Sequence, residues 1–171
     1  MIKWEAFSYN GEIYDLSHLW PELWTYEQPA SNGKAAKFYR IRIIYSLHCF
    51  TMGNEPEHDP LLRYADARET RTFCFTRHTQ SYLLPEIMRN IGTGYVLHTG
   101  HSSYLRVDSG SAQYEVYFSV TRSKEKCADL QVNIKSAYIR TKGGEPKAGK
   151  IRFSVIAFNT LNNKPIKPIR R

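Results

Sequence analysis

Residues 113–158 read QYEVYFSVTRSKEKCADLQVNIKSAYIRTKGGEPKAGKIRFSVIAF, and this stretch decides the fold. Three of its segments alternate apolar and polar residues with a period of two. The apolar members are Tyr114, Val116, Phe118 and Val120, then Leu130, Val132, Ile134 and Tyr138, then Ile151, Phe153, Val155 and Ala157. Because side chains alternate across a strand, each segment has one face suited to a core. The polar connections predict three neighbouring antiparallel strands that form a meander.

Working outward, the N-terminal residues 2–16 contain two strand-like runs joined by Asn10-Gly11. Both positions of this dipeptide tolerate positive φ, so the pattern predicts a β-hairpin. Residues 38–50 predict a second long strand, and residues 99–110 predict a polar loop. An apolar stripe from Tyr82 to Ile91 predicts a helix, which Pro85 allows only within its first turn.

The whole pattern predicts an α+β fold: an antiparallel meander, one principal helix and an N-terminal β-hairpin. The 171 residues suit a single domain over residues 1–160. Residues 161–171, LNNKPIKPIRR, contain two prolines and no periodicity. They predict a basic tail that is flexible or folds on a polyanion.

The net charge of +8 is concentrated at one end of the sequence. From Arg140 onward there are nine basic residues and one acidic residue, whereas the first 139 residues are balanced. A localised basic region is typical of proteins that bind polyanions, so nucleic acid, and RNA in particular, is the expected partner. The alternative is a solvated tail that only keeps the protein soluble.

Three cysteines at wide spacing do not form a disulfide framework, which favours a reducing compartment. The N-terminus lacks a signal-peptide pattern, and no apolar run approaches the roughly 20 residues that span a bilayer. We therefore expect a cytoplasmic protein without a membrane partner. The acidic loop around His58 matches neither an EF-hand nor a zinc pattern, so neither a metal nor another cofactor is predicted.

Four residues have the side chains that metal-independent RNA cleavage requires, which are a base, an acid and a cationic group for the phosphorane. Arg77 and His78 precede the expected helix, where unpaired N–H groups favour an anion. Tyr138 and Arg140 end a predicted strand at the basic end of the sheet. Further residues that could bind substrate are Arg40, Arg42, His48, Lys135 and Arg152.

The order of a helix with Arg-His and then three antiparallel strands resembles the barnase/EndoU/colicin/RelE-like nucleases of phage and plasmid toxins. The segments that carry the resemblance are FTRHTQSYLLPEIMRNI (75–91), YEVYFSV (114–120), LQVNIKSAYIR (130–140) and IRFSVIAF (151–158). The chain is also similar to small proteins of enterobacterial prophages and mobile elements through YDLSHLWP (14–21), YSLHCFT (45–51) and SAYIR (136–140). The resemblance implies that His78, Arg77, Tyr138 and Arg140 lie where such nucleases keep catalytic groups.

Two functions follow as expectations. The first is a metal-independent endoribonuclease of the toxin type, encoded by a phage or mobile element, with a protein partner such as an antitoxin. The second is a non-catalytic phage protein that binds nucleic acid or a host protein as an inhibitor or regulator. RNA cleavage in EDTA and toxicity on expression distinguish them.

Overall fold

The computed structural model describes residues 3–31, 33–99, 103–109, 112–140 and 147–167. Within these residues the largest sheet has seven strands in the order β12-β8-β9-β10-β11-β4-β3. They are β3 (Glu22–Gln28), β4 (Lys37–Tyr45), β8 (Tyr95–His98), β9 (Ser103–Ser109), β10 (Ala112–Arg122), β11 (Leu130–Ile139) and β12 (Gly149–Arg152). Neighbouring strands are antiparallel except β11 and β4, which are parallel.

Two smaller sheets and three helices complete the described fold. A hairpin is formed by β1 (Phe7–Tyr9) and β2 (Glu12–Tyr14), and a second sheet has the order β5-β7-β6. The second sheet contains β5 (Thr51–Met52), β6 (Arg63–Ala65) and β7 (Thr70–Phe73). The helices are α1 (Phe75–Ser81), α2 (Leu84–Arg89) and α3 (Phe153–Leu161), with short 3-10 turns η1 (Ser17–Leu19), η2 (Leu47–Cys49), η3 (Pro60–Leu62) and η4 (Ile91–Thr93). The α+β class, the antiparallel sheet and the N-terminal hairpin are confirmed.

The hairpin turn has the geometry that its sequence predicts. Asn10 has a φ of 50° and Gly11 a φ of 82°, and Tyr9 pairs with Glu12 on either side of them. Positive φ at both central residues is the signature of a two-residue turn whose twist matches that of the strands.

We expect Gly11→Val to lower the free energy of unfolding by about 1 kcal/mol or more, because a β-branched residue resists positive φ. Nothing lies within 4 Å of a Cβ at this position, so the loss reports backbone strain alone. Urea denaturation measures it. Gly94→Val is the matched control, since Gly94 is extended and equally open. Equal losses in the two variants would contradict the turn assignment.

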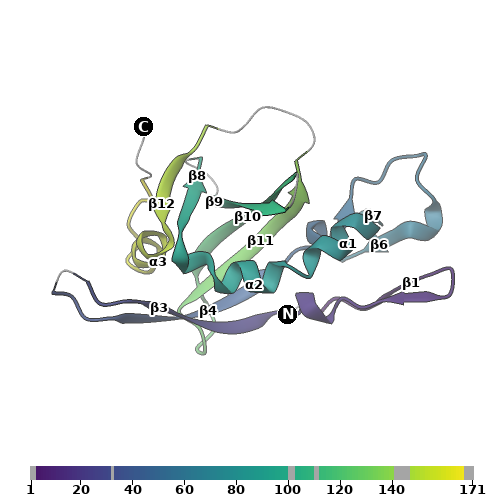
Figure 1. Cartoon of the computed structure of the whole chain (residues 1–171). Coiled ribbons are helices and arrows are strands. Elements are labelled where there is room, and N and C mark those ends of the chain that lie inside the picture. The colour runs from purple at the N-terminus through teal and green to yellow at the C-terminus, as the bar shows by residue number, and fades with distance from the viewer. Residues whose placement is uncertain (1–2, 32, 100–102, 110–111, 141–146, 168–171) are drawn as a thin grey trace.

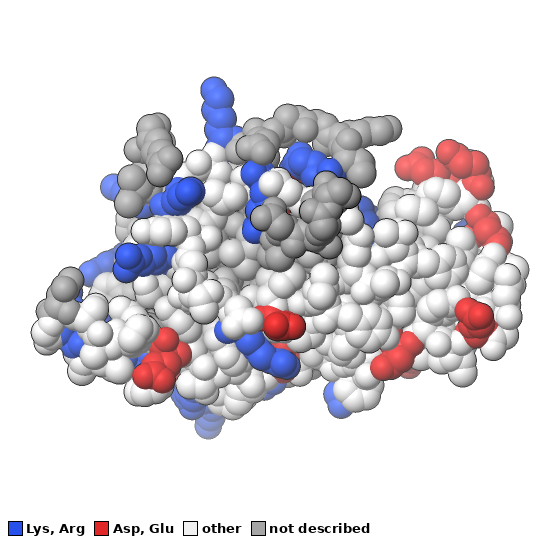
Figure 2. All heavy atoms as spheres, in the orientation of Figure 1, with Lys and Arg blue, Asp and Glu red and all other residues white. Residues whose placement is uncertain are grey.

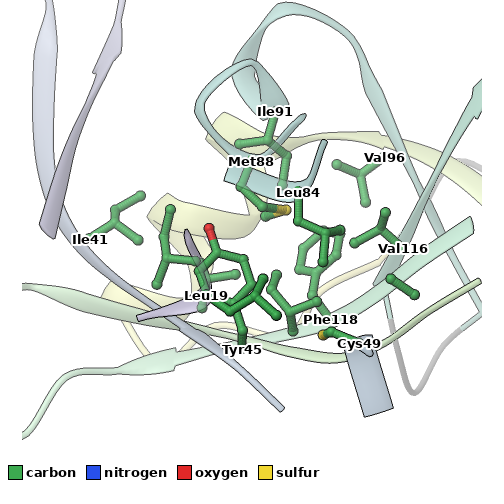
Figure 3. Packing of buried hydrophobic residues seen from close by; sticks show 14 of the residues in the cluster. Leu19, Ile41, Tyr45, Cys49, Leu84, Met88, Ile91, Val96, Val116 and Phe118 are labelled. Atoms are coloured by element: carbon green, nitrogen blue, oxygen red, sulfur yellow. The ribbon is translucent and has the colours of Figure 1, made fainter. Parts of the chain in front are cut away.

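The core lies between one face of the large sheet and helices α2 and α3 (Figure 1). Leu84, Met88 and Ile91 point from α2 and η4 toward Tyr45 and Phe118 of the sheet (Figure 3). These five residues are at most 2% exposed. Of the stripe predicted from Tyr82 to Ile91, Met88 and Ile91 are buried as expected, but Tyr82 is 50% exposed and Leu83 is 43% exposed. Leu84 takes their place in the core.

The third strand of the predicted meander is wrong beyond Arg152. The strand β12 ends there, and α3 begins at Phe153. Phe153, Ile156 and Ala157 are buried while Val155 is 42% exposed, which is the spacing of a helix rather than a strand. In addition, β12 pairs with β8, and β4 takes the place next to β11.

Two boundaries in the large sheet also differ from the prediction. The second long strand ends at Tyr45, and Leu47 and Cys49 continue its buried face from the 3-10 turn η2. The expected polar loop over residues 99–110 contains strand β9, because the long strand β10 provides a partner along its length.

The principal helix is divided in two. We expected Arg77 and His78 to precede a helix that starts near Tyr82, but both lie inside α1. A new helix, α2, begins at Leu84 with Pro85 in its first turn. Pro85 has no N–H with which to continue the hydrogen-bond ladder of α1, so the helix is interrupted before it. No described helix has the length and apolar character needed to cross a membrane.

Candidate functional site

A β-bulge in β11 places Tyr138 and Arg140 at the candidate site. Tyr117 pairs with Ser136, but the next residue of β10, Phe118, pairs with Ile134, so Lys135 is an extra residue. Beyond it the side chains of β11 change faces. Tyr138 therefore lies opposite Glu115 on the face turned away from the core, whereas we expected it to share a face with Ile134.

Three tyrosines stack across neighbouring strands on this outer face. The ring centroids of Tyr104 and Tyr117 are 5.1 Å apart with an interplanar angle of 20°, and those of Tyr117 and Tyr138 are 5.8 Å apart at 15°. Tyr104 is buried, and the other two are half-buried. The result is an aromatic row across β9, β10 and β11.

One buried carboxylate holds two arginines beside this row. Arg106 donates to Glu115 Oε1 from Nε at 3.2 Å and from Nη2 at 3.0 Å. Arg140 Nε donates to Glu115 Oε2 at 2.8 Å, and the Tyr117 hydroxyl donates to the same oxygen at 2.6 Å. Burial raises the pKa of Glu115, but the hydrogen bonds from Tyr117 and the two arginines outweigh it, so the pKa lies below its usual value. Glu115 is therefore ionised at neutral pH.

Arg77 reaches the other end of the row from α1. Its Cζ lies 5.2 Å from the centroid of the Tyr138 ring, and Nη1 donates to the carbonyl oxygens of Thr51 at 2.6 Å and His48 at 3.3 Å. Burial lowers the pKa of Arg77, although an arginine remains charged at neutral pH.

Arg77 also differs from the other half-buried arginines of the described chain. Each of the others has a carboxylate partner; these pairs are Arg42–Glu125, Arg71–Glu69, Arg106–Glu115 and Arg140–Glu115. Arg77 forms no ion pair with a carboxylate of the described residues. We call the set of Arg77, Tyr104, Arg106, Glu115, Tyr117, Tyr138 and Arg140 the arginine–tyrosine face. Its members carry three guanidinium groups and one carboxylate.

Of the four candidate catalytic residues, the structure brings Arg77 and Tyr138 into contact and places Arg140 beside Tyr117. The contacts of His78 lie elsewhere. Its Nε2 donates to the Asp15 carbonyl at 2.9 Å, and its ring packs against Tyr14, Phe73, His18 and Tyr82. Consecutive helical residues point about 100° apart, which explains why Arg77 contacts Tyr138 while His78 contacts Asp15.

His18 packs against His78 and Tyr82, and its tautomer is defined by its hydrogen bond. Ser81 Oγ donates to the His78 carbonyl at 2.7 Å, so His18 Nε2, 2.7 Å from Ser81 Oγ, must donate its proton. His18 Nδ1 is then an acceptor, buried without a partner among the described residues. Burial, followed by the nearby His78, lowers the pKa of His18 from 6.5 to about 4, although Asp15 opposes the shift.

We expect the stability of the protein to fall as the pH drops from 6.5 to 4. In this range His18 binds a proton in the unfolded chain but stays neutral in the folded protein. The loss should be about 1–2 kcal/mol, less than the full shift implies because His18 is partly solvated. Urea denaturation at several pH values measures it. His18→Gln should remove this part of the slope and His48→Gln should keep it; a slope unchanged in His18→Gln would contradict the assignment.

The candidate substrate-binding residues do not converge on one surface. Arg40 forms an ion pair with Asp129 at 2.7 Å, Arg42 with Glu125 at 3.0 Å, and His48 lies 2.8 Å from Glu69. Because Arg40, Arg42 and His48 are already paired with carboxylates, their side chains are poor phosphate ligands. Lys135 is exposed at the bulge, and Arg152 lies 5.7 Å from the ring of Tyr95 at the far edge of the sheet.

Sequence reasoning missed Tyr104 and Arg106, which we placed in a polar loop. The signal was present, because SYLRVDS (103–109) alternates Leu105 and Val107 with Tyr104 and Arg106. On the face in Figure 2 most Lys and Arg lie toward β12 and α3, whereas Asp and Glu predominate at the end that contains β1, β6 and β7.

Fold and site together define an α+β protein that presents an arginine–tyrosine face on the outer side of a largely antiparallel sheet. The chain belongs to the YjaZ family, whose model matches residues 6–161. It is 32% identical over 172 residues to Protein YjaZ of Escherichia coli (strain K12), an alignment that covers 96% of this chain and 94% of that protein. No solved structure matches the chain.

Proposed function

We propose that the protein binds RNA on its arginine–tyrosine face, in the cytoplasm, as a non-catalytic inhibitor or regulator. The observation that carries this proposal is the row of stacked tyrosines flanked by Arg77 and Arg140. Tyrosine rings and guanidinium planes stack on unpaired bases, and arginines bind phosphates. The three guanidinium groups exceed the single carboxylate, so the face favours an anion.

Binding is favoured over cleavage by the placement of the proton-transfer groups. Cleavage without a metal requires a base and an acid beside the cationic group. Glu115 is ionised but accepts hydrogen bonds from two arginines and a tyrosine, which makes it a weak base. His78, the other candidate, contacts the cluster around Asp15. The toxin-type ribonuclease, with or without an antitoxin partner, is the alternative that the following experiment tests.

We expect a fluorescein-labelled single-stranded RNA of 12 uridines to bind in EDTA, as measured by fluorescence anisotropy at several salt concentrations. Arg77→Gln should weaken binding about 10-fold and reduce the magnitude of the salt slope by about 0.7, because one phosphate contact is lost. Tyr138→Ala should weaken binding about 10-fold with the slope unchanged, because stacking does not release counterions.

Arg40→Gln is the matched control, since it removes the same charge from an exposed arginine paired with Asp129. It should leave affinity nearly unchanged, and thermal melts should show all three variants folded. Equal weakening in Arg40→Gln and Arg77→Gln would mean that net charge alone binds RNA and would overturn the proposed site. RNA cut to 2′,3′-cyclic phosphate ends, with cutting abolished in His78→Ala, would support the ribonuclease instead.

A further inference from the structure

The strand β3 forms one edge of the seven-stranded sheet, and among the described residues it pairs with β4 alone. No backbone group of β3 forms a hydrogen bond with any described residue outside β4. The free edge runs without interruption over all seven residues, from Glu22 to Gln28. Backbone N–H and C=O groups along such an edge can pair with one further strand.

The two edges of the sheet differ in how they are protected from such pairing. Natural edge strands are often kept short or given exposed charges, lysine above all. The opposite edge, β12, has four residues, of which Lys150 and Arg152 are exposed cations. In β3, whose seven residues are all described, Glu27 is the one exposed charge, because Glu22 is half-buried and paired with Arg89. The edge at β3 is therefore the one that is open to a further strand.

The sequence of this edge suits pairing with a second copy of itself. Pro21 and Pro29 flank β3 at equal distances from its central residue, Thr25. In an antiparallel pair centred on Thr25, the whole strand is therefore used, and Pro21 of one copy lies opposite Pro29 of the other. Proline has no N–H to donate, so both prolines lie where the ladder of hydrogen bonds ends.

The same register places no like charges opposite each other. Leu23 of one copy faces Glu27 of the other, and Glu22 faces Gln28, each pair occurring twice by symmetry. At the centre Thr25 faces Thr25, and cross-strand threonine pairs are favourable. Pairing would also cover part of the Leu23 side chain, which is 49% exposed.

We propose that two copies of the chain pair antiparallel through β3, about a twofold axis at Thr25, and so join their large sheets into one. Leu23, Thr25 and Glu27 share a face of β3, and the register keeps this face on the same side in both copies. The two arginine–tyrosine faces consequently lie on the same side of the joined sheet. No residue of β3 belongs to that face, so the dimer does not depend on RNA binding.

A charge swap at the twofold axis tests the proposal, with sedimentation equilibrium as the measurement of the dimer Kd. Thr25→Lys and Thr25→Glu each place two like charges opposite each other, so each variant alone should have a Kd about 10-fold higher or more. An equimolar mixture of the two variants should form a dimer at least as tight as that of the native protein, because opposite charges then face each other. Thr25 is exposed, so both variants should fold.

A second set of variants tests the register and decides alone if a Thr25 variant does not fold. Leu23→Glu places an acid opposite Glu27 of the other copy and should weaken the dimer, and Glu27→Lys added to the same chain should restore it. Lys150→Glu, on the opposite edge of the sheet, is the control and should leave the Kd unchanged.

Three results would overturn the proposal. The first is a native protein that sediments as a monomer even at millimolar concentration. The second is a dimer that the charge swaps at positions 25, 23 and 27 neither weaken nor restore as stated. The third is a dimer that Lys150→Glu weakens as much as Thr25→Glu does, since it would then form through β12.

Discussion

Replacing Glu115 by alanine should lower the free energy of unfolding by about 3–5 kcal/mol, the cost of removing one partner from a buried ion pair. Glu115 is fully buried and is the described carboxylate that pairs with Arg106 and Arg140. Without it, two half-buried guanidinium groups repel each other, and the Tyr117 hydroxyl loses its acceptor. Urea denaturation at neutral pH measures the loss.

Glu125→Ala is the matched control for this substitution. Glu125 accepts a similar ion pair from Arg42, but its side chain is 35% exposed. The Arg42 side chain is only 14% exposed, but water can reach it from the side of the exposed carboxylate once Glu125 is removed, so the control should cost less than Glu115→Ala. If Glu115→Ala were no more destabilising than Glu125→Ala, Glu115 would not be the electrostatic centre of the face.

The Gly92→Ala substitution should cost about 1–3 kcal/mol through overpacking. A Cβ on Gly92 would lie too close to Tyr26 Cε2 for any real contact, and 3.0 Å from Cδ2. The Tyr26 ring cannot easily move, because it packs edge-on against Phe153 at 5.1 Å and lies near Trp24 and Tyr39.

Gly94→Ala provides the comparison, because nothing lies within 4 Å of a Cβ at that position and the backbone there is extended. It should change the melting temperature little, whereas Gly92→Ala should lower it by several degrees. Similar melting temperatures for the two variants would show that the contact between η4 and β3 is loose.

Local signals predicted the parts of the fold that local physics determines. Asn10-Gly11 specifies its turn because both residues accept positive φ, and the alternation from Tyr114 to Val120 determines which face of β10 is buried. The C-terminal segment was ambiguous. Phe153, Val155 and Ala157 fit a strand, while Phe153, Ile156 and Ala157 fit a helix, and only packing against β10 and β11 decides between them.

The candidate site was predicted only in part, for a reason that is also physical. Arg77, Tyr138 and Arg140 were identified by residue type, but their grouping depends on the extra residue at Lys135, which changes the face of everything beyond it. Nothing in the local sequence around Lys135 marks a bulge. Pairing with the preceding strand β10 creates it, and Tyr104 and Arg106 join the site through the same partner strand.

The parallel pairing of β4 with β11 affects how the chain folds during synthesis. Tyr45 ends β4 and Leu130 begins β11, so β4 leaves the ribosome about 85 residues before its partner, a delay of roughly 4–17 s at typical translation rates. Throughout this delay one edge of β4 has only solvent or another chain to pair with, and such open edges promote aggregation. The high contact order of this pairing also slows refolding. The nascent protein is therefore most vulnerable between the synthesis of these two strands, which is when a holding chaperone would act on it.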